Sequence, residues 1–215
     1  MKIASMALLC ALALAACSSD GATKKTFTEL SALIRVSKAP AVNLRAQLTP
    51  EIAAQTDAPL FLLTLPQRDA AQALFAQEQT SGANTSWRSG SGEGIVLQGG
   101  VLQATRGLGG DLITSDVADV RAALAGRIHR GERVHRHLDG EDKLIAEAYV
   151  CDYTRSADST QAYFQTLPAT RINESCTGLV QEFDNTYWVD GTGRVLRAIE
   201  WAGPAIGYIE REQLQ

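Results

Sequence analysis

Three histidines that fall close together are the residues of this chain best suited to binding a metal: His129, His135 and His137. Side chains two residues apart lie on the same face of a β-strand, so His135 and His137 could supply two ligands. No third strong ligand follows at a diagnostic spacing, and three arginines interleave with the histidines: Arg130, Arg133 and Arg136. Such a basic segment is typical of a solvated edge strand, and we predict no metal ion.

Two glycine-rich segments do not match the arrangements used for nucleophilic catalysis or phosphate binding. Ser89–Gly94 contains no G-x-S-x-G sequence and no helix pattern follows it. It therefore predicts a flexible turn rather than a nucleophile elbow. Gly107–Gly110 lacks the lysine of a phosphate-binding loop and does not lead into a helix pattern.

Paired carboxylates, which acid–base catalysis needs, occur at Glu141 and Asp142 and again at Glu210 and Glu212. Catalysis also requires the two groups to lie close in space, which a sequence does not show. Neighbouring acidic residues of this kind are typical of a solvated surface. We predict no catalytic residue and no cofactor.

Aromatic side chains could present their rings to a sugar. The chain has three tryptophans, Trp87, Trp188 and Trp201, and tyrosines Tyr187 and Tyr208 lie near the last two of them. Rings of this kind more often pack in a core or an interface. Carbohydrate contact is therefore one of two interpretations.

The N-terminus is typical of an exported lipoprotein. Lys2 is followed by an apolar run, Ile3–Ala16, that is shorter than the roughly 20 residues needed to span a bilayer. Leu14–Cys17 resembles the lipobox of bacterial lipoprotein precursors; an ordinary secreted protein is the alternative. We expect residues 1–16 to be removed, Cys17 to carry acyl chains, and residues 17–25 to form a tether. Ser18, rather than Asp, follows Cys17, which by resemblance to Gram-negative sorting favours the periplasmic face of the outer membrane.

The predicted processing of the N-terminus assigns different roles to the four cysteines. Cys10 leaves with the signal peptide and Cys17 is lipidated, so Cys151 and Cys176 are left in an oxidising compartment. We expect them to form a disulfide. A redox-active pair is the alternative, but the chain has no C-x-x-C sequence.

Composition and periodicity predict a single β-rich domain over residues 26–215. Hydrophobic residues make up 45% of the 215, and the net charge of −4 disfavours nucleic-acid binding. Two short helices are expected, at Thr26–Ile34 and at Asp116–Ala125, the second capped by Ser115 and ended by Gly126. The expected strands are Leu60–Leu65, Ala73–Gln79, Ile95–Gln98, Val101–Thr105, Arg133–Leu138, Lys143–Tyr153, Tyr187–Val189 and Arg194–Trp201.

Short turns between these strands predict hairpins, at Gly99-Gly100, Asp139–Asp142 and Asp190–Gly193. Successive hairpins with short connections indicate an antiparallel meander. The predicted fold class is therefore mainly β, with the meander forming a curled sheet or half-barrel and with two short helices.

The order of several motifs resembles the YjbF/GfcB lipoproteins. The matching segments are Ser86-Trp87, Ile95–Leu97, Gly99–Leu112, Phe183–Asp190, Gly193–Val195, Trp201, Gly203-Pro204 and Gly207-Tyr208. The resemblance implies an antiparallel β fold and an accessory role in exopolysaccharide or group 4 capsule production. It also implies an outer-membrane barrel protein as a partner, and it carries over no catalytic residue.

The sequence therefore predicts a non-enzymatic lipoprotein that supports polysaccharide secretion by binding a barrel partner or the polysaccharide. The candidate recognition residues are Trp87, Thr105, Gly107, Leu108, Trp188, Trp201, Gly207 and Tyr208. Tight turns that need glycine for a positive φ are the alternative for Thr105–Leu112 and Gly203–Tyr208. A glycan-modifying envelope enzyme and a purely structural envelope lipoprotein are the alternative functions.

Overall fold

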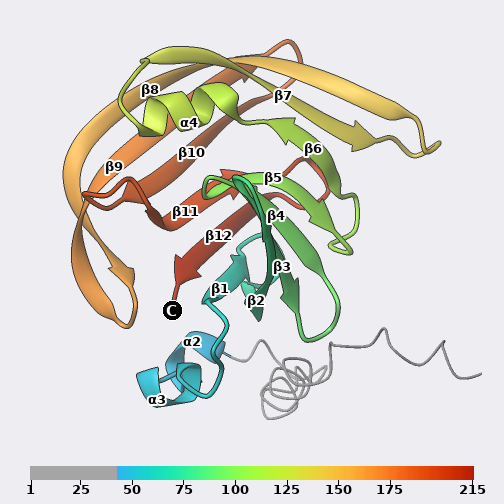
Figure 1. The fold of residues 1–215 in the computed structure, drawn as a ribbon. Coiled ribbons are helices and arrows are strands. Elements are labelled where there is room, and N and C mark those ends of the chain that lie inside the picture. The colour runs from blue at the N-terminus through green and yellow to red at the C-terminus, as the bar shows by residue number, and fades with distance from the viewer. Residues whose placement is uncertain (1–42) are drawn as a thin grey trace, which may run out of the picture.

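A computed structural model describes residues 43–215 of the chain (Figure 1). The predicted signal peptide, the lipidation site Cys17, the tether and the expected helix at Thr26–Ile34 lie outside these residues. They stay predictions from the sequence.

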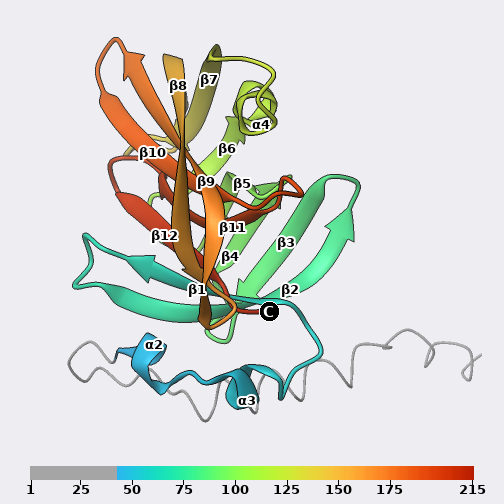
Figure 2. The ribbon, with the colours of Figure 1, turned by 90° about the vertical axis from the view of Figure 1, so that its left-hand side faces the viewer.

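Twelve antiparallel strands form one sheet that curls into a nearly closed barrel (Figures 1 and 2). In chain order they are β1 (Leu60–Leu65), β2 (Ala71–Ser81), β3 (Asn84–Ser89), β4 (Gly94–Gln98), β5 (Val101–Arg106), β6 (Leu112–Asp116), β7 (Arg130–Leu138), β8 (Leu144–Ala162), β9 (Gln165–Gly178), β10 (Glu182–Val189), β11 (Val195–Trp201) and β12 (Tyr208–Gln213). The order across the sheet is β5-β4-β3-β2-β1-β12-β11-β10-β9-β8-β7-β6, so β5 and β6 are its edges. The prediction of a mainly β, curled antiparallel meander is confirmed.

The hairpin between β4 and β5 shows why the local turn residues determine the pairing. Gly99 and Gly100 have φ of 57° and 84°, which are the left-handed values that both central residues of a type I′ turn require. A side chain on Gly100 would also meet Val195, because an added Cβ would lie 2.9 Å from that residue's Cγ2. Glycine is therefore needed at this position for both conformation and space.

Two four-residue helices cover the outer face of β1 and were not predicted. They are α2 (Leu44–Gln47) and α3 (Pro50–Ala53), and neither is long enough to show a helical period. Successive side chains of a strand point to opposite faces. Leu60 and Leu62 accordingly pack in a cluster with the α2 residue Leu44, whereas Phe61 and Leu63 pack inside the barrel. This two-sided burial explains the uninterrupted apolar run of β1.

The third helix, α4 (Ala118–Leu124), lies where the sequence predicted one, but its N-cap differs. Ser115 is not the cap: it belongs to β6, and its Oγ accepts a hydrogen bond from Arg133 Nε at 3.2 Å. The N-cap residue is Val117, and Asp116 Oδ1 accepts from the backbone N–H of Ala118 at 3.1 Å. Gly126, with φ of 73°, follows the C-cap as expected. Within residues 43–215, no helix is long and apolar enough to cross a membrane.

The two edges of the sheet are joined by side chains of the predicted turn. Asp111 accepts hydrogen bonds from the Thr105 hydroxyl (2.8 Å) and from the backbone N–H groups of Gly107 (2.7 Å) and Leu108 (3.0 Å). Thr105 Oγ1 in turn accepts from the N–H of Leu112, the first residue of β6, at 3.0 Å. This turn therefore connects β5 to β6 at the seam where the barrel does not close by strand pairing.

Candidate functional site

A pocket of about 410 Å³ opens at the end of the barrel where β8 ends and β9 begins. Its volume lies in the usual range for small-ligand sites. Residues from several turns and strand ends line it: Pro59, Gln77, Thr85, Trp87, Leu97, Gly99, Gly100, Tyr163, Arg194, Val195, Arg211, Gln213 and Gln215. The walls thus combine aromatic rings, amide groups and guanidinium groups.

Trp87, a predicted recognition residue, forms part of the wall of this pocket. Its side chain is largely buried, and its ring centroid lies 4.7 Å from that of Phe61. The indole N–H donates to Thr85 Oγ1 at 2.9 Å, and Thr85 also lines the pocket. Both neighbours fix the orientation of the ring.

Tyr163 enters the pocket from a strained turn between β8 and β9. Tyr163 and Phe164 have φ of 49° and 61°, a conformation that is rare for bulky residues. The surrounding structure holds it: the N–H of Tyr163 donates to the carbonyl of Gln213 at 2.8 Å. Phe164 lies under the guanidinium of Arg45, 5.2 Å from its ring centroid. The tip of this long hairpin is thereby fixed against β12 and α2.

Two arginines face the pocket and differ in burial. Arg194 is exposed, donates to Asp190 Oδ2 through Nε and Nη2 at 3.2 Å, and lies 5.3 Å from the Tyr163 ring centroid. Arg211 is buried; its Nη2 donates to the Gly100 carbonyl at 2.8 Å and to Glu200 at 2.5 Å. Its Nε has no hydrogen-bond partner.

Glu200 accepts a hydrogen bond from a backbone N–H of an edge strand inside the barrel. Its carboxylate is fully buried and accepts from Arg211 and from the backbone N–H of Leu102 in β5, the latter at 2.9 Å. That N–H belongs to the edge strand β5. The carboxylate therefore replaces a strand partner inside the barrel.

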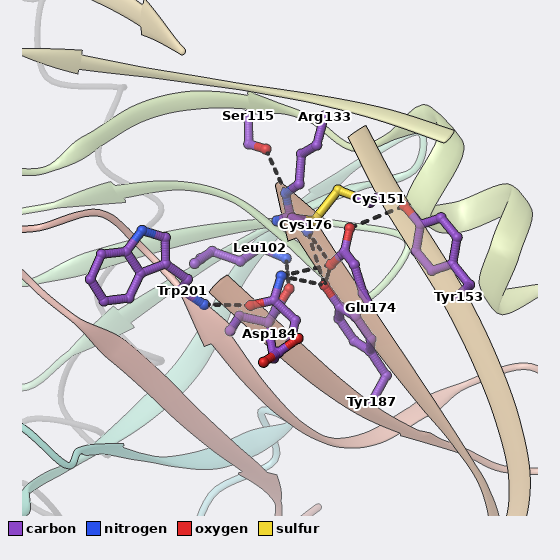
Figure 3. Close-up of polar contacts among 12 residues, drawn as sticks. Leu102, Ser115, Arg133, Cys151, Tyr153, Glu174, Cys176, Asp184, Tyr187 and Trp201 are labelled. Atoms are coloured by element: carbon purple, nitrogen blue, oxygen red, sulfur yellow. Dashed lines mark hydrogen bonds and ion pairs between the residues drawn. A yellow bond between two sulfur atoms is a disulfide. The ribbon is translucent and has the colours of Figure 1, made fainter. Parts of the chain in front are cut away.

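A second buried ion pair lies deeper in the barrel (Figure 3). Arg133 Nη1 donates to Glu174 Oε2 at 2.7 Å and to the Tyr187 hydroxyl at 3.0 Å, and all three side chains are fully buried. Asn185 and Tyr153 also donate to Glu174, at 2.6 and 3.0 Å. Burial is the largest single influence and opposes the charge on Arg133, but the attractions of Glu174, Tyr187 and Glu200 together outweigh it and raise the arginine pKa above its usual value. Arg133 is thus held charged.

The histidines correct the expectation of a solvated edge strand. His135 and His137 do share one face of β7, but that face points into the barrel and both side chains are buried. His135 Nε2 accepts from Arg133 Nε at 2.8 Å. Burial, and then the neighbouring charge of Arg133, lower the pKa of His135 to about 2, so the ring is neutral. Arg133 is likewise an interior residue and not a surface cation.

A metal centre is not assembled around these rings. Among residues 43–215, the group of potential ligands close enough to share one ion is Cys151, Glu174 and Cys176. Cys151 and Cys176 lie directly opposite each other on β8 and β9 and form a disulfide. Their sulfurs are therefore not metal ligands.

Arg68 joins the two predicted recognition turns, in which Gly107, Pro204 and Ala205 stay exposed. Arg68 donates to the carbonyl of Leu108 at 2.5 Å and, through Nη2, to that of Ala205 at 2.9 Å. Leu108 and Gly207 are buried. Thr105 therefore contributes to the turn, and Leu108 and Gly207 contribute to packing. A recognition role for Thr105, Gly107, Leu108 and Gly207 stays a prediction.

The remaining predicted aromatics lie away from the pocket. Trp188 is half-buried, donates from Nε1 to Asp158 Oδ2 at 3.0 Å, and lies under Arg197. Trp201 and Tyr208 are cross-strand partners with ring centroids 5.2 Å apart. The structure thus places only Trp87 of the predicted recognition residues at the pocket.

Several pocket residues were missed from the sequence. Tyr163-Phe164 contains none of the glycine, asparagine or aspartate that marks a two-residue turn, so the hairpin tip gave no signal. Arg194 follows a predicted turn, but nothing in its spacing connects it with Trp87. Arg211 is an isolated cation whose burial only the register of β12 reveals.

The opposite end of β8 has a different surface. The exposed large apolar side chains of residues 43–215 lie on β6, at the β7–β8 turn, along β8 and at the turn between β9 and β10: Ile113, Leu138, Leu144, Ile145, Val150, Leu179 and Val180. We call this set the apolar corner. Leu179 and Val180 are 104% and 90% exposed, so the turn that carries them contacts almost nothing.

An unpaired strand edge runs beside this corner. β8 pairs with β7 from Leu144 onward, but its pairing with β9 begins only at Tyr149, which lies opposite Gly178. In the part of the chain that the structure describes, no strand pairs with the β9-facing edge of residues 144–148. Figure 1 shows this hairpin extending away from the barrel.

Comparison with known proteins supports a family assignment. The family model described as "Group 4 capsule polysaccharide lipoprotein gfcB, YjbF" matches residues 24–214. No curated protein matches the chain. Among solved structures, the hypothetical lipoprotein YmcC from Escherichia coli K12 is similar, with a TM-score of 0.67 and 15% sequence identity. The match covers 84% of this chain and 98% of that one, which shows a shared fold.

The family match spans most of the chain, including the seam turn, the disulfide and all the pocket residues except Gln215. Its description connects the family with capsule polysaccharide and with lipoproteins, not with an enzyme activity. The chain belongs to the YjbF family of group 4 capsule polysaccharide lipoproteins.

Proposed function

We propose that this protein is an outer-membrane-anchored periplasmic lipoprotein that supports capsule or exopolysaccharide secretion by binding the polysaccharide. The observation that carries the proposal is the pocket at the end of the barrel. Trp87 and Tyr163 supply aromatic rings, and Gln77, Gln213 and Thr85 supply amide and hydroxyl groups. Ring faces and such polar groups together suit a sugar, which has both C–H faces and hydroxyls.

The rigid setting of the pocket agrees with binding rather than with chemistry. The Trp87 ring is held by Thr85 and Phe61, and the Tyr163 turn is held by Gln213. No carboxylate side chain is among the lining residues. A glycan-hydrolysing site needs two carboxyl groups across the scissile bond, so the alternative of a glycan-modifying enzyme finds no support at this pocket.

The test of this proposal is restoration of polysaccharide export in a strain that lacks the gene. We expect deletion to lower the extracellular polysaccharide and the wild-type gene to restore it. Tyr163→Asn should restore less than Trp188→Phe, which removes an indole outside the pocket. An unchanged polysaccharide yield on deletion would favour the purely structural envelope lipoprotein.

The anchor is tested separately through Cys17. Acyl chains on this residue would give stable membrane attachment, because each buried CH₂ contributes about 0.8 kcal/mol. We expect Cys17→Ser to release the protein into the soluble periplasmic fraction. Retention of that variant in the outer membrane would contradict the proposed attachment.

A second proposed function, docking of an outer-membrane barrel protein, is favoured by the apolar corner. Apolar patches that stay exposed on a folded protein often mark protein interfaces, and an unpaired strand edge can accept a strand from a partner. Acidic residues surround the corner, at Asp139, Glu141, Asp142 and Glu182, whereas Lys143 is the one cation in the β7–β8 turn. The surface therefore fits a partner whose apolar face is bordered by lysines or arginines.

This docking is tested by site-specific photo-crosslinking in cells. A photoreactive residue at Val180 should crosslink to an outer-membrane barrel protein, identified by mass spectrometry, whereas one at Ser159 should not. Leu179→Asp should abolish the Val180 product. Crosslinking to a second copy of this chain, to lipid alone, or to nothing would overturn the proposal.

A further inference from the structure

We propose that the pocket binds an acidic saccharide, in which a sugar carboxylate lies against Arg194 and Arg211. This inference rests on the proposed polysaccharide binding and names its chemical class. Two features of the pocket support it: the positive charge of its walls and the hydrogen-bond donors that the walls leave unpaired.

Arg211 is the first of the two cations. Its side chain is only 6% exposed, and it lines the pocket. Glu200 and the Gly100 carbonyl accept from Nη2, whereas Nε is buried without a hydrogen-bond partner. An unpaired donor on a buried guanidinium is costly. Because Nε is itself sealed from solvent, Arg211 acts on an anion in the pocket through its charge and not through this N–H.

Arg194 is the second cation and lies at the open rim. Its Nε and Nη2 both donate to the same oxygen of Asp190, and no hydrogen bond engages Nη1. The guanidinium also lies over the Tyr163 ring, which limits the directions it can take. Arginine binds carboxylates well because its planar donors match two oxygens at once.

The lining residues add no negative charge to that of Asp190 and Glu200, the carboxylates already paired with Arg194 and Arg211. Among the side chains that line the pocket, the charged ones are Arg194 and Arg211, and none is a carboxylate. The polar remainder consists of Gln77, Thr85, Gln213 and Gln215, and the Gln213 amide donates to the main-chain oxygen of Gln215 at 2.7 Å. Amides and a hydroxyl can bind the sugar hydroxyls while the arginines bind the carboxylate.

The test is isothermal titration of the full-length protein in detergent with two matched oligosaccharides. One is a hyaluronan tetrasaccharide, which carries glucuronate, and the other is the same tetrasaccharide with its carboxylates reduced to alcohols. We expect the acidic form to bind roughly tenfold more tightly at low salt, the difference typical of a hydrogen bond to a charged group. High salt should reduce the difference in affinity between the two tetrasaccharides.

Variants assign the effect to the pocket. Arg194→Gln should remove most of the preference for the acidic form. Adding the conservative change Arg211→Lys should weaken that preference further without removing the buried charge. Arg127→Gln removes an exposed arginine outside the pocket and is the control for net charge. It should leave the preference unchanged.

The outcomes separate this inference from the proposed function. Equal binding of both tetrasaccharides, abolished by Tyr163→Asn, would overturn the acidic class and keep polysaccharide binding. Binding of neither would contradict both. A preference for the acidic form that Arg194→Gln leaves intact would place the carboxylate elsewhere and overturn the assignment.

Discussion

The two ends of β8 have opposite chemistry. At Ala162 the strand reaches the pocket, where amides, guanidiniums and a strained aromatic turn are fixed by hydrogen bonds. At Leu144 it reaches the apolar corner, where the strand edge is unpaired and acidic residues surround exposed apolar side chains. One end presents polar groups to a pocket, and the other leaves apolar surface and backbone groups unused. The proposal of two separate binding tasks rests on this difference.

Between the two ends lies a polar interior that keeps their spacing. The Arg133–Glu174 pair joins β7 to β9, and the Arg211–Glu200 pair joins β12 to β11. Buried pairs of this kind are weak evidence for stability, because desolvation offsets the attraction. Their role here is to fix the packing of a barrel whose interior is not filled by apolar side chains alone.

Removing one partner of the Arg133–Glu174 pair should lower the free energy of unfolding more than any of the other changes. It should disturb both ends of β8 together. Glu174→Gln leaves the Arg133 charge buried without its carboxylate, and we expect the free energy of unfolding to fall by about 3–5 kcal/mol. Denaturant titration measures this change. Glu141→Gln, which breaks an exposed pair with Lys143, is the control and should change stability by about 1 kcal/mol at most. Equal effects of the two would mean that the interior pair is not structurally important.

The disulfide should affect the apolar corner more than the pocket, since Cys151 lies two residues from Tyr149, where β9 pairing begins. It closes a loop with a sequence separation of 25. Replacing both cysteines by alanine should lower the unfolding free energy by about 2–4 kcal/mol. Hydrogen exchange should rise first around residues 145–151. A rise in hydrogen exchange confined to the pocket end would contradict the expectation that the disulfide mainly supports the apolar corner.

Acid should likewise weaken the corner end, where the buried histidines lie. His135 stays neutral when folded, with a pKa lowered to about 2, whereas the unfolded chain takes up a proton near pH 6.5. The unfolded state therefore binds more protons between these values, and stability is lost as the pH falls below about 6.5. From pH 7 to pH 5 we expect a loss of about 2 kcal/mol from this group. Denaturant titration at both pH values should show that His135→Gln makes this loss smaller, while His137, whose pKa burial also lowers, keeps its own contribution.

Substitution of Tyr163 should separate binding from stability at the pocket end. Asparagine tolerates a positive φ better than tyrosine does, so Tyr163→Asn removes the ring while relaxing the turn. We expect saccharide affinity to fall about twofold to tenfold, since aromatic contacts contribute roughly 0.5–1.5 kcal/mol. The unfolding free energy should change by less than about 1 kcal/mol. Unchanged affinity in a calorimetric titration would remove Tyr163 from the site.

The smallest effect on stability is expected at the apolar corner. Leu179→Ser with Val180→Ser replaces side chains that are almost fully exposed. The unfolding free energy should change by about 0.5 kcal/mol at most. Crosslinking to the partner from a photoreactive residue at Leu144, another residue of the apolar corner, should nevertheless be lost. A large loss of stability in thermal unfolding would show that these residues belong to the core.

Local patterns predicted much of the fold, because turns and alternating strands are determined by nearby residues. Gly99-Gly100 and the apolar run of β1 illustrate this success. The interior was not predictable: Glu174 and Glu200 occupy ordinary strand positions, and only the curling of the sheet buries them. In β11 the half-exposed face carries Ile199 and Trp201, whereas the buried face carries Ala198 and Glu200.

The pocket was equally beyond local reasoning. Its residues come from turns that are distant in the sequence and meet only when the barrel closes. Trp87 was identified because of its residue type, while Tyr163 and Arg211 carried no local signal. Long-range register, rather than composition, determines this site.

Hydrogen exchange of the full-length protein, with and without the hyaluronan tetrasaccharide, tests the division of tasks most directly. The account predicts added protection at the turns carrying Gly99-Gly100, Tyr163 and Arg194. It predicts no change over residues 144–148 or 178–181. Protection at the apolar corner, with none at the pocket turns, would contradict the assignment of saccharide binding to the pocket end.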